Sequence, residues 1–160
     1  MANTAQNPSS EIVESQRRRR EAVRVLAGAA TAEIEQLLRT LASLPAFEDM
    51  RPAESGLLML RGRIGGDGAP FNFGEATVSR ATIRLESGET GFGYALGRDA
   101  SKARLIALCD AMLQTEIYRV PLEDKVLSPL RLKQEKARDV KAQEIAATKV
   151  EFFTLVRGED

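Results

Sequence analysis

The stretch that decides the fold covers residues 57–96 and reads LLMLRGRIGGDGAPFNFGEATVSRATIRLESGETGFGYAL. Three runs within it alternate apolar with polar residues or are rich in β-branched residues, which is typical of strands. The predicted strands are 57–64, 76–85 and 90–96. In the first of them, Leu58, Leu60 and Ile64 are expected to share one buried face. A glycine-rich loop and a Ser-Gly turn join the strands, so the sequence predicts an antiparallel meander.

Helical spacing precedes these strands. Apolar residues recur at intervals of three and four over 14–28, and again from Thr31 until Pro45 ends the pattern. Thr31 is expected to cap the second helix, because Glu33 and Glu35 follow it in the first turn. The two segments predict an N-terminal helical hairpin.

Helical spacing returns after the strands. Apolar residues form one stripe between Leu105 and Met112, and the polar Asp110 lies largely off that stripe. Asp99 or Ser101 is expected to cap this helix. The prolines at 121 and 129 are expected to bound an irregular passage.

The C-terminal part is predicted to add a helix and a strand. Residues 130–147 read as a long charged helix with a narrow apolar face, which indicates a helix that is solvated or packed on another protein. The β-branched and aromatic residues at 150–156 predict a strand that rejoins the sheet. Residues 1–14 are interpreted as a disordered tail, so 15–160 is expected to be a single domain. The predicted fold class is therefore α+β, with an N-terminal helical hairpin, an antiparallel β-meander, two C-terminal helices and a final strand joining the sheet.

The composition of the 160 residues excludes several classes of function. Basic and acidic residues both number 23, so no global field attracts nucleic acid or an anionic membrane. The absence of histidine removes the common catalytic dyads and all imidazole metal ligands. The single Cys109 excludes an intrachain disulfide and a thiolate zinc site, and it is expected to be a small core residue. No metal site is predicted, no stretch is apolar for long enough to span a membrane, and the simplest compartment is a reducing cytosol.

Two glycine-rich motifs are expected to be structural. Gly91, Gly93 and Gly97 precede a helix with one residue too many for a dinucleotide fingerprint. Glycines at alternate strand positions instead leave room for a neighbouring element. The GGDG loop at 65–68 lacks the residues of a phosphate loop and is expected to be a hairpin tip.

Arginines provide the candidates for binding. Arg61 and Arg63 share one face of the first predicted strand. Arg80 and Arg84 share one face of the next, so pairing of the strands could bring four guanidinium groups to one surface. Guanidinium groups bind phosphate and phosphonate oxygens in a bidentate geometry, and Arg98 at a helix start could add a fifth anion contact. The alternative is a solvated sheet face on which the arginines pair with acidic side chains.

The run of four arginines at 17–20, together with the basic helix, points to nucleic acid. Without interleaved aromatic residues, such a run is more typical of a solvated helix start. Two alternative functions therefore remain open from the residues alone, a nucleic-acid-binding α+β module and a free-standing nucleotide-binding protein.

Several blocks of the chain carry more than generic patterns. They are ESGL at 54–57, RGRIGGDGAPFNFGEATVSRATIRL at 61–85, GFGYALGRD at 91–99, DAMLQ at 110–114 and the C-terminal VEFFTLVRGED. In this order and with these gaps they closely resemble the PhnG family, a component of the bacterial carbon-phosphorus lyase system. The likeness extends from about residue 25 to residue 160.

The resemblance implies a cytoplasmic member of a complex with subunits H, I, J, K and L. With subunits H, I and L it implies that methylphosphonate displaces adenine from C1′ of MgATP, giving α-D-ribose 1-methylphosphonate 5-triphosphate. Of these partners, the I component is credited with the nucleosidase chemistry, so no catalytic residue is assigned to this chain. No cofactor is expected on it either, since MgATP is a substrate of the complex. The isolated chain is expected to be able to self-associate through an uncovered sheet face.

The resemblance also supplies candidates for loop or interface contacts. These are Glu54, Gly65, Gly66, Asp67, Gly68, Tyr94, Asp99, Phe152, Phe153 and Arg157.

Overall fold

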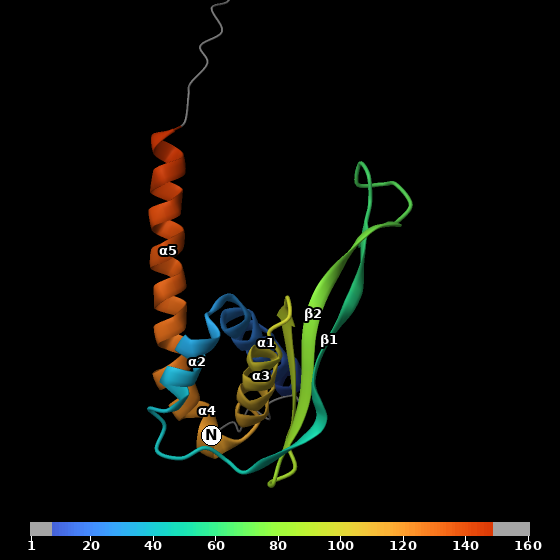
Figure 1. The fold of residues 1–160 in the computed structure, drawn as a ribbon. Helices are drawn as coiled ribbons and strands as arrows, with labels where there is room; N and C mark the ends of the chain where they lie inside the picture. Colours follow the sequence, from blue (N-terminus) through green and yellow to red (C-terminus); the bar gives the residue numbers. More distant parts are fainter. Residues whose placement is uncertain (1–7, 149–160) are drawn as a thin grey trace, which may run out of the picture.

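The structure is a computed structural model that describes residues 8–148. It has the expected α+β architecture, in which helices precede and follow a three-stranded sheet along the chain (Figure 1). The elements are α1 Pro8–Gly28, α2 Thr31–Leu38, β1 Phe47–Gly62, β2 Phe71–Leu85, β3 Thr90–Leu96, α3 Ala100–Met112, α4 Glu116–Leu122, the π-helix η1 Glu123–Leu127 and α5 Ser128–Ala147. The strand expected at 150–156 lies outside the described residues, as do Phe152, Phe153 and Arg157.

The sheet is the predicted antiparallel meander in the order β1-β2-β3. β1 pairs with β2 along its whole length, from Phe47 opposite Leu85 to Gly62 opposite Phe71. β3 pairs with only the second half of β2, and its last partner is Val78. The remaining part of the β1-β2 hairpin, residues 57–76, therefore projects beyond the third strand (Figure 1). We call it the hairpin arm.

The first two strands begin earlier than predicted. β1 starts at Phe47 rather than residue 57, and β2 starts at Phe71 rather than residue 76. The sequence signal for the start of β1 is weak because Pro52 cannot donate a ladder hydrogen bond. The structure accommodates Pro52 because β1 is an edge strand whose register shifts on both sides of Arg51.

The helix α3 covers one face of the sheet, which we call the inner face, and the opposite face is the outer face. Alternate residues of β2 and β3, among them Ile83 and Ala95, are buried under α3. The glycines of β3 allow this close packing. A Cβ on Gly91 would lie 2.6 Å from the amide nitrogen of Ala111, and one on Gly93 would lie 2.7 Å from that of Ala107. The expected steric role of these glycines is confirmed.

Both N-terminal helices pack on α3, and α1 also contacts β3. α1 begins at Pro8, so residues 8–14, which were expected to belong to a disordered tail, are helical. Thr31 does not cap α2. The N-cap position is Ala30, which makes no side-chain cap hydrogen bond, and the Thr31 hydroxyl instead donates to Asp99 at the start of α3.

The passage between the two prolines is helical, which corrects the prediction of irregular structure. α4 contains Pro121, and the π-helix η1 follows it and leads directly into α5. Pro121 has no amide hydrogen to give to the preceding turn, and a π-turn is one way in which a helix continues past such a defect. In α5 only Leu130 is buried. The first turns, as far as Gln134, contact α1 and α2, and the remainder of the helix projects from the body of the molecule (Figure 1). The narrow apolar face predicted for this helix is confirmed.

The hairpin arm and α5 extend from the same side of the body (Figure 1). The buried face expected for Leu58, Leu60 and Ile64 is wrong, because Leu58 is 54% exposed and Ile64 is 76% exposed. These residues lie beyond the reach of α3, where no other described element covers them. Among the helices within 8–148, none is both long enough and apolar enough to cross a membrane.

Candidate functional site

The predicted arginine surface is divided along the length of the sheet. Arg80 and Arg84 lie on the outer face of β2, where each is opposite a glutamate of β1. The Arg80 Nε donates to the Glu54 Oε1 at 2.9 Å, and the Arg84 Nη1 lies 3.8 Å from the Glu48 Oε1. This part of the sheet therefore has the cross-paired arrangement that was the alternative to an anion site.

Arg61 lies elsewhere, in the hairpin arm. It pairs with Asn72, which precedes Arg80 by eight positions on β2. At roughly 3.3 Å per strand residue, the two arginines are therefore separated by about 26 Å. Arg63 lies further away still, beyond the end of β1. The expectation that four guanidinium groups share one surface is therefore wrong. Alternation shows which residues of one strand share a face, but it does not show which positions of two strands lie opposite each other.

Arg98 and Asp99 mark the start of α3. The Asp99 carboxylate accepts from the backbone amide of Lys102 at 2.8 Å and from the Thr31 hydroxyl. These hydrogen bonds, with Thr31 contributing most, lower the pKa of Asp99 below its ordinary value. Asp99 thus caps α3 as predicted. Its carboxylate already accepts the hydrogen bond from the Lys102 amide that an external anion would otherwise accept.

The GGDG loop forms the tip of the hairpin arm, as predicted. Gly65 and Gly66 have φ values of 66° and 76°, which favour glycine, and a Cβ on Gly68 would contact the carbonyl oxygen of Ile64. Asp67 is exposed in this loop. The loop lies at the far end of the arm from Arg80 and Arg84 (Figure 1).

The outer face of β3 is apolar. Phe92 and Tyr94 share this face, as predicted from their spacing, and both are about half exposed. Tyr94 lies opposite Arg80 in the neighbouring strand, and Leu96 at the end of β3 is 80% exposed. Tyr94, Arg80 and Glu54 are therefore brought together across all three strands.

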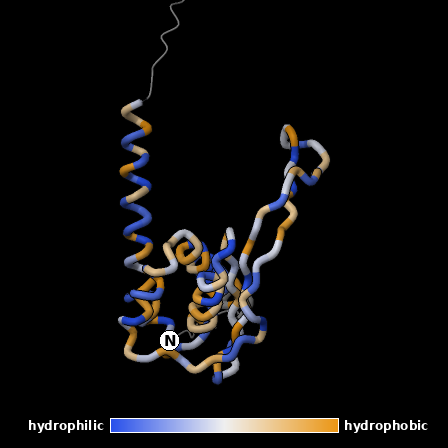
Figure 2. The backbone as a smooth tube through the Cα atoms, in the orientation of Figure 1, coloured by the Kyte–Doolittle hydropathy of each residue, from blue (hydrophilic) through white to orange (hydrophobic). Residues whose placement is uncertain are grey.

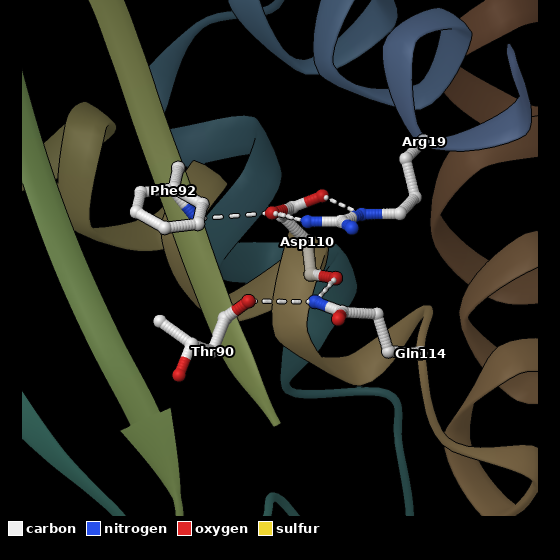
Figure 3. Close-up of polar contacts among 5 residues, drawn as sticks. All are labelled: Arg19, Thr90, Phe92, Asp110 and Gln114. Carbon is white, nitrogen blue, oxygen red and sulfur yellow. Dashed lines mark hydrogen bonds and ion pairs between the residues drawn. The ribbon is translucent and has the colours of Figure 1, made fainter. Parts of the chain in front are cut away.

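The main polar cluster of the body centres on Asp110, which sequence reasoning placed off the buried stripe of α3. Its side chain is 4% exposed and accepts two hydrogen bonds from Arg19, at 2.8 Å from Nε and 2.7 Å from Nη2 (Figure 3). The Phe92 amide donates to the same carboxylate at 2.9 Å. Gln114, in the turn just after α3, donates to the carbonyl oxygen of Thr90 at 2.7 Å.

This cluster joins α1, β3 and α3. The hydrogen bond to Asp110 raises the Arg19 pKa above its ordinary value. The Phe92 amide and the Thr90 carbonyl belong to the free edge of β3, which would otherwise be open to another strand. Asp110 and Gln114 therefore satisfy the hydrogen-bonding groups of that edge at Thr90 and Phe92, so that another strand cannot pair there.

A cleft of about 540 Å³ lies between α1, α4, η1 and α5. Its charged lining consists of Arg18, Arg19, Glu21, Arg119, Glu123, Asp124 and Arg131. Two of these arginines already form ion pairs. Arg131 lies 2.7 Å from Glu123, and Arg19 lies 2.7 Å from Asp110. The hydrogen bond to Glu123 raises the pKa of Arg131. The cleft is close to electrically neutral and does not form a strong site for a polyphosphate.

The described residues offer binding surfaces rather than a reaction centre. Cys109 is fully buried, and burial raises its pKa to about 12, so the thiolate needed for nucleophilic attack is not formed. Its expected place in the core is confirmed. Across 8–148, no three acidic or cysteine side chains are grouped so as to hold a metal ion.

The comparisons with known proteins agree on one relationship. The family described as "Phosphonate metabolism protein PhnG" matches residues 17–158. The chain is also 48% identical over 145 residues to the alpha-D-ribose 1-methylphosphonate 5-triphosphate synthase subunit PhnG of Rhizobium meliloti (strain 1021). That alignment covers 89% of this chain and 90% of the relative, so the two proteins correspond along nearly their whole lengths.

Proposed function

Since the chain belongs to the PhnG family, we propose that it is a subunit of α-D-ribose 1-methylphosphonate 5-triphosphate synthase in phosphonate catabolism. It is needed there for coupling methylphosphonate to MgATP with release of adenine. The observation that carries this proposal is the identity of 48% to a subunit of that name over almost the whole of both chains.

The partners that we propose are subunits H, I, J, K and L of the carbon-phosphorus lyase system, acting together in the cytoplasm. The chain contributes binding surfaces, and another subunit supplies the proton donor for the departing adenine. Two features support this division of labour: the chain has no histidine, and its one thiol is buried with a raised pKa.

The alternative functions receive no support from the described residues. In the basic run at 17–20, Arg17 lies 3.2 Å from Glu14 and Arg19 holds Asp110, so two of the four guanidinium groups already contact acids. The neutral cleft beside α1 likewise does not favour a free-standing nucleotide-binding protein.

The arginines predicted to contact anions lie in two separate places, so we treat them as two separate candidate sites. Arg61 and Arg63 lie at the end of the hairpin arm, while Arg80 and Arg84 lie on the outer face of the body. We propose that one of these pairs faces substrate in the complex. Alanine at each pair in turn should lower the rate of phosphonate coupling for one pair, and unchanged rates for both would remove the arginines from the mechanism.

The proposed function is tested by omission. The cognate subunits H, I, J and L are co-expressed with and without this chain, and adenine release and phosphonate-dependent product are measured separately. Without the chain, adenine release by hydrolysis should continue while the phosphonate product is lost. Equal amounts of phosphonate product in both preparations would contradict the proposal.

A further inference from the structure

The hairpin arm carries apolar side chains on both of its faces. Adjacent strand residues point to opposite faces, so Leu57 and Met59 lie on the inner face and Leu58 lies on the outer face. Their exposed fractions are 68%, 50% and 54%. Phe71 and Phe73, in the second strand of the arm, are also exposed. Figure 2 shows apolar and polar residues interspersed along the arm.

The arm has no described element to pack against. β3 ends opposite Val78, and the hydrogen bond from the Gly97 amide to the Thr77 carbonyl is the last one before the chain turns away into α3. Within the described residues, the edge of β2 along 71–76 has no partner strand. A two-stranded ribbon by itself is only marginally stable in water. A long exposed apolar edge also invites aggregation unless something covers it.

Charge does not explain what the arm binds. Its charged residues are Arg61, Arg63, Asp67 and Glu75, two of each sign. A partner recognised through this surface is therefore selected by apolar burial rather than by a charged patch.

The distribution over both faces sets the shape of the partner. A flat surface, or a second arm packed face to face, would bury one face of the ribbon and leave the other in water. A cleft covers both. The arm comprises about 20 residues, which is roughly what one protein contributes to an interface of standard size.

We propose that the hairpin arm inserts into an apolar cleft of another subunit of the synthase. The inference rests on the proposed function, since it takes the partner from the same complex. It adds the surface that makes the contact, the chemistry of that contact and the enclosing shape of the partner's site.

The test uses two adjacent residues that point in opposite directions. Leu57→Glu places a charge on the inner face of the arm, and Leu58→Glu places one on the outer face. Ile117→Glu is the matched control, because Ile117 is 78% exposed on α4 and lies outside the arm. Each full-length variant is tagged and co-expressed with subunits H, I, J and L, and the co-purified subunits are quantified.

Insertion into a cleft predicts that both arm variants lose at least tenfold of the co-purified subunits, while Ile117→Glu retains them. Loss in only one arm variant would show one-sided docking and overturn the inference, as would normal assembly of both. Failure of the wild-type chain to retain any subunit would overturn the proposed function together with the inference. Self-association that the arm variants abolish without affecting assembly would assign the arm to a second copy instead.

A second measurement does not depend on how the variants fold. Amide hydrogen exchange of the wild-type chain, alone and in the complex, reports both strands of the arm. Insertion predicts exchange at least tenfold slower in the complex over both 57–62 and 71–76. Unchanged exchange in both segments would overturn the inference.

Discussion

Asp110 is the residue on which three elements of the body depend. Its buried carboxylate accepts hydrogen bonds from Arg19 of α1 and from the Phe92 amide of β3. A carboxylate removed from water is costly unless it is paired and hydrogen-bonded, and here it is both. The position of Asp110 therefore fixes how α1 and the edge of β3 sit on α3.

Removing either partner of this ion pair should destabilise the fold. We expect Asp110→Asn and Arg19→Gln each to lower the free energy of unfolding by about 2–4 kcal/mol, because each leaves a charge in a mostly buried site without its partner. The double variant should lose less than the sum of the two. Urea unfolding measures all three variants.

The matched control is Asp49→Asn, which breaks the exposed pair of Asp49 with Arg104, 2.9 Å apart. An exposed pair of this kind contributes about 0–1 kcal/mol. Equal losses for Asp110→Asn and Asp49→Asn would contradict the structural role given to Asp110.

Because Cys109 is buried, the free energy of unfolding should decrease at alkaline pH. Its pKa is about 12 in the folded chain because of burial, against about 8.5 in an unfolded chain. The stabilisation from burying the neutral thiol is fully present below pH about 8.5 and is lost as the pH rises toward 12, because the unfolded chain releases the proton first. The free energy of unfolding of the wild type should thus fall between pH 8.5 and 10.5 relative to that of Cys109→Ala. A constant difference between the two proteins would contradict this account.

Individual residues show what sequence reasoning could and could not find. The cap at Asp99 follows from its place before a helix, and the steric role of Gly93 follows from its place in a strand. The role of Asp110 does not follow from the apolar stripe at 105–112, because that stripe is only part of the packing surface of α3. The overlooked signal is a second stripe of small residues, Ala103, Ala107 and Ala111, which packs on the glycines of β3.

At the scale of elements, β3 can pack closely on α3 only because Gly91 and Gly93 have no side chain facing the helix. Gly93→Ala should lower the free energy of unfolding by about 3 kcal/mol or more, since its Cβ would contact the backbone of Ala103 and Ala107, which cannot rotate away. Gly74→Ala is the control, because a Cβ at that position of β2 meets nothing within 4 Å. Thermal unfolding of the two variants distinguishes them, and equal midpoints would contradict the close packing of α3 on β3.

The strands show why the predicted site differs from the observed one. Alternation within a strand places Arg61 and Arg63 together, and likewise Arg80 and Arg84. Which positions of two strands coincide depends on their register, and here Glu54 rather than Arg61 lies opposite Arg80. Bulges and Pro52 at the edge of the sheet set this register, and neither effect appears as periodicity in the sequence.

The whole molecule consists of a packed body with two projections, the hairpin arm and α5 (Figure 1). Burial in the body accounts for the fold, whereas no element within residues 8–148 covers the exposed apolar residues of the arm. This division agrees with a subunit whose surface is completed by its partners.

The central claim is that this chain is the subunit that couples methylphosphonate to MgATP. Its most direct test is to titrate the purified chain into a fixed amount of subunits H, I and L and to measure the ribose 1-methylphosphonate 5-triphosphate formed. Product should rise from background and reach a plateau at a fixed ratio of this chain to its partners. Product formation that does not respond to added chain would contradict the claim.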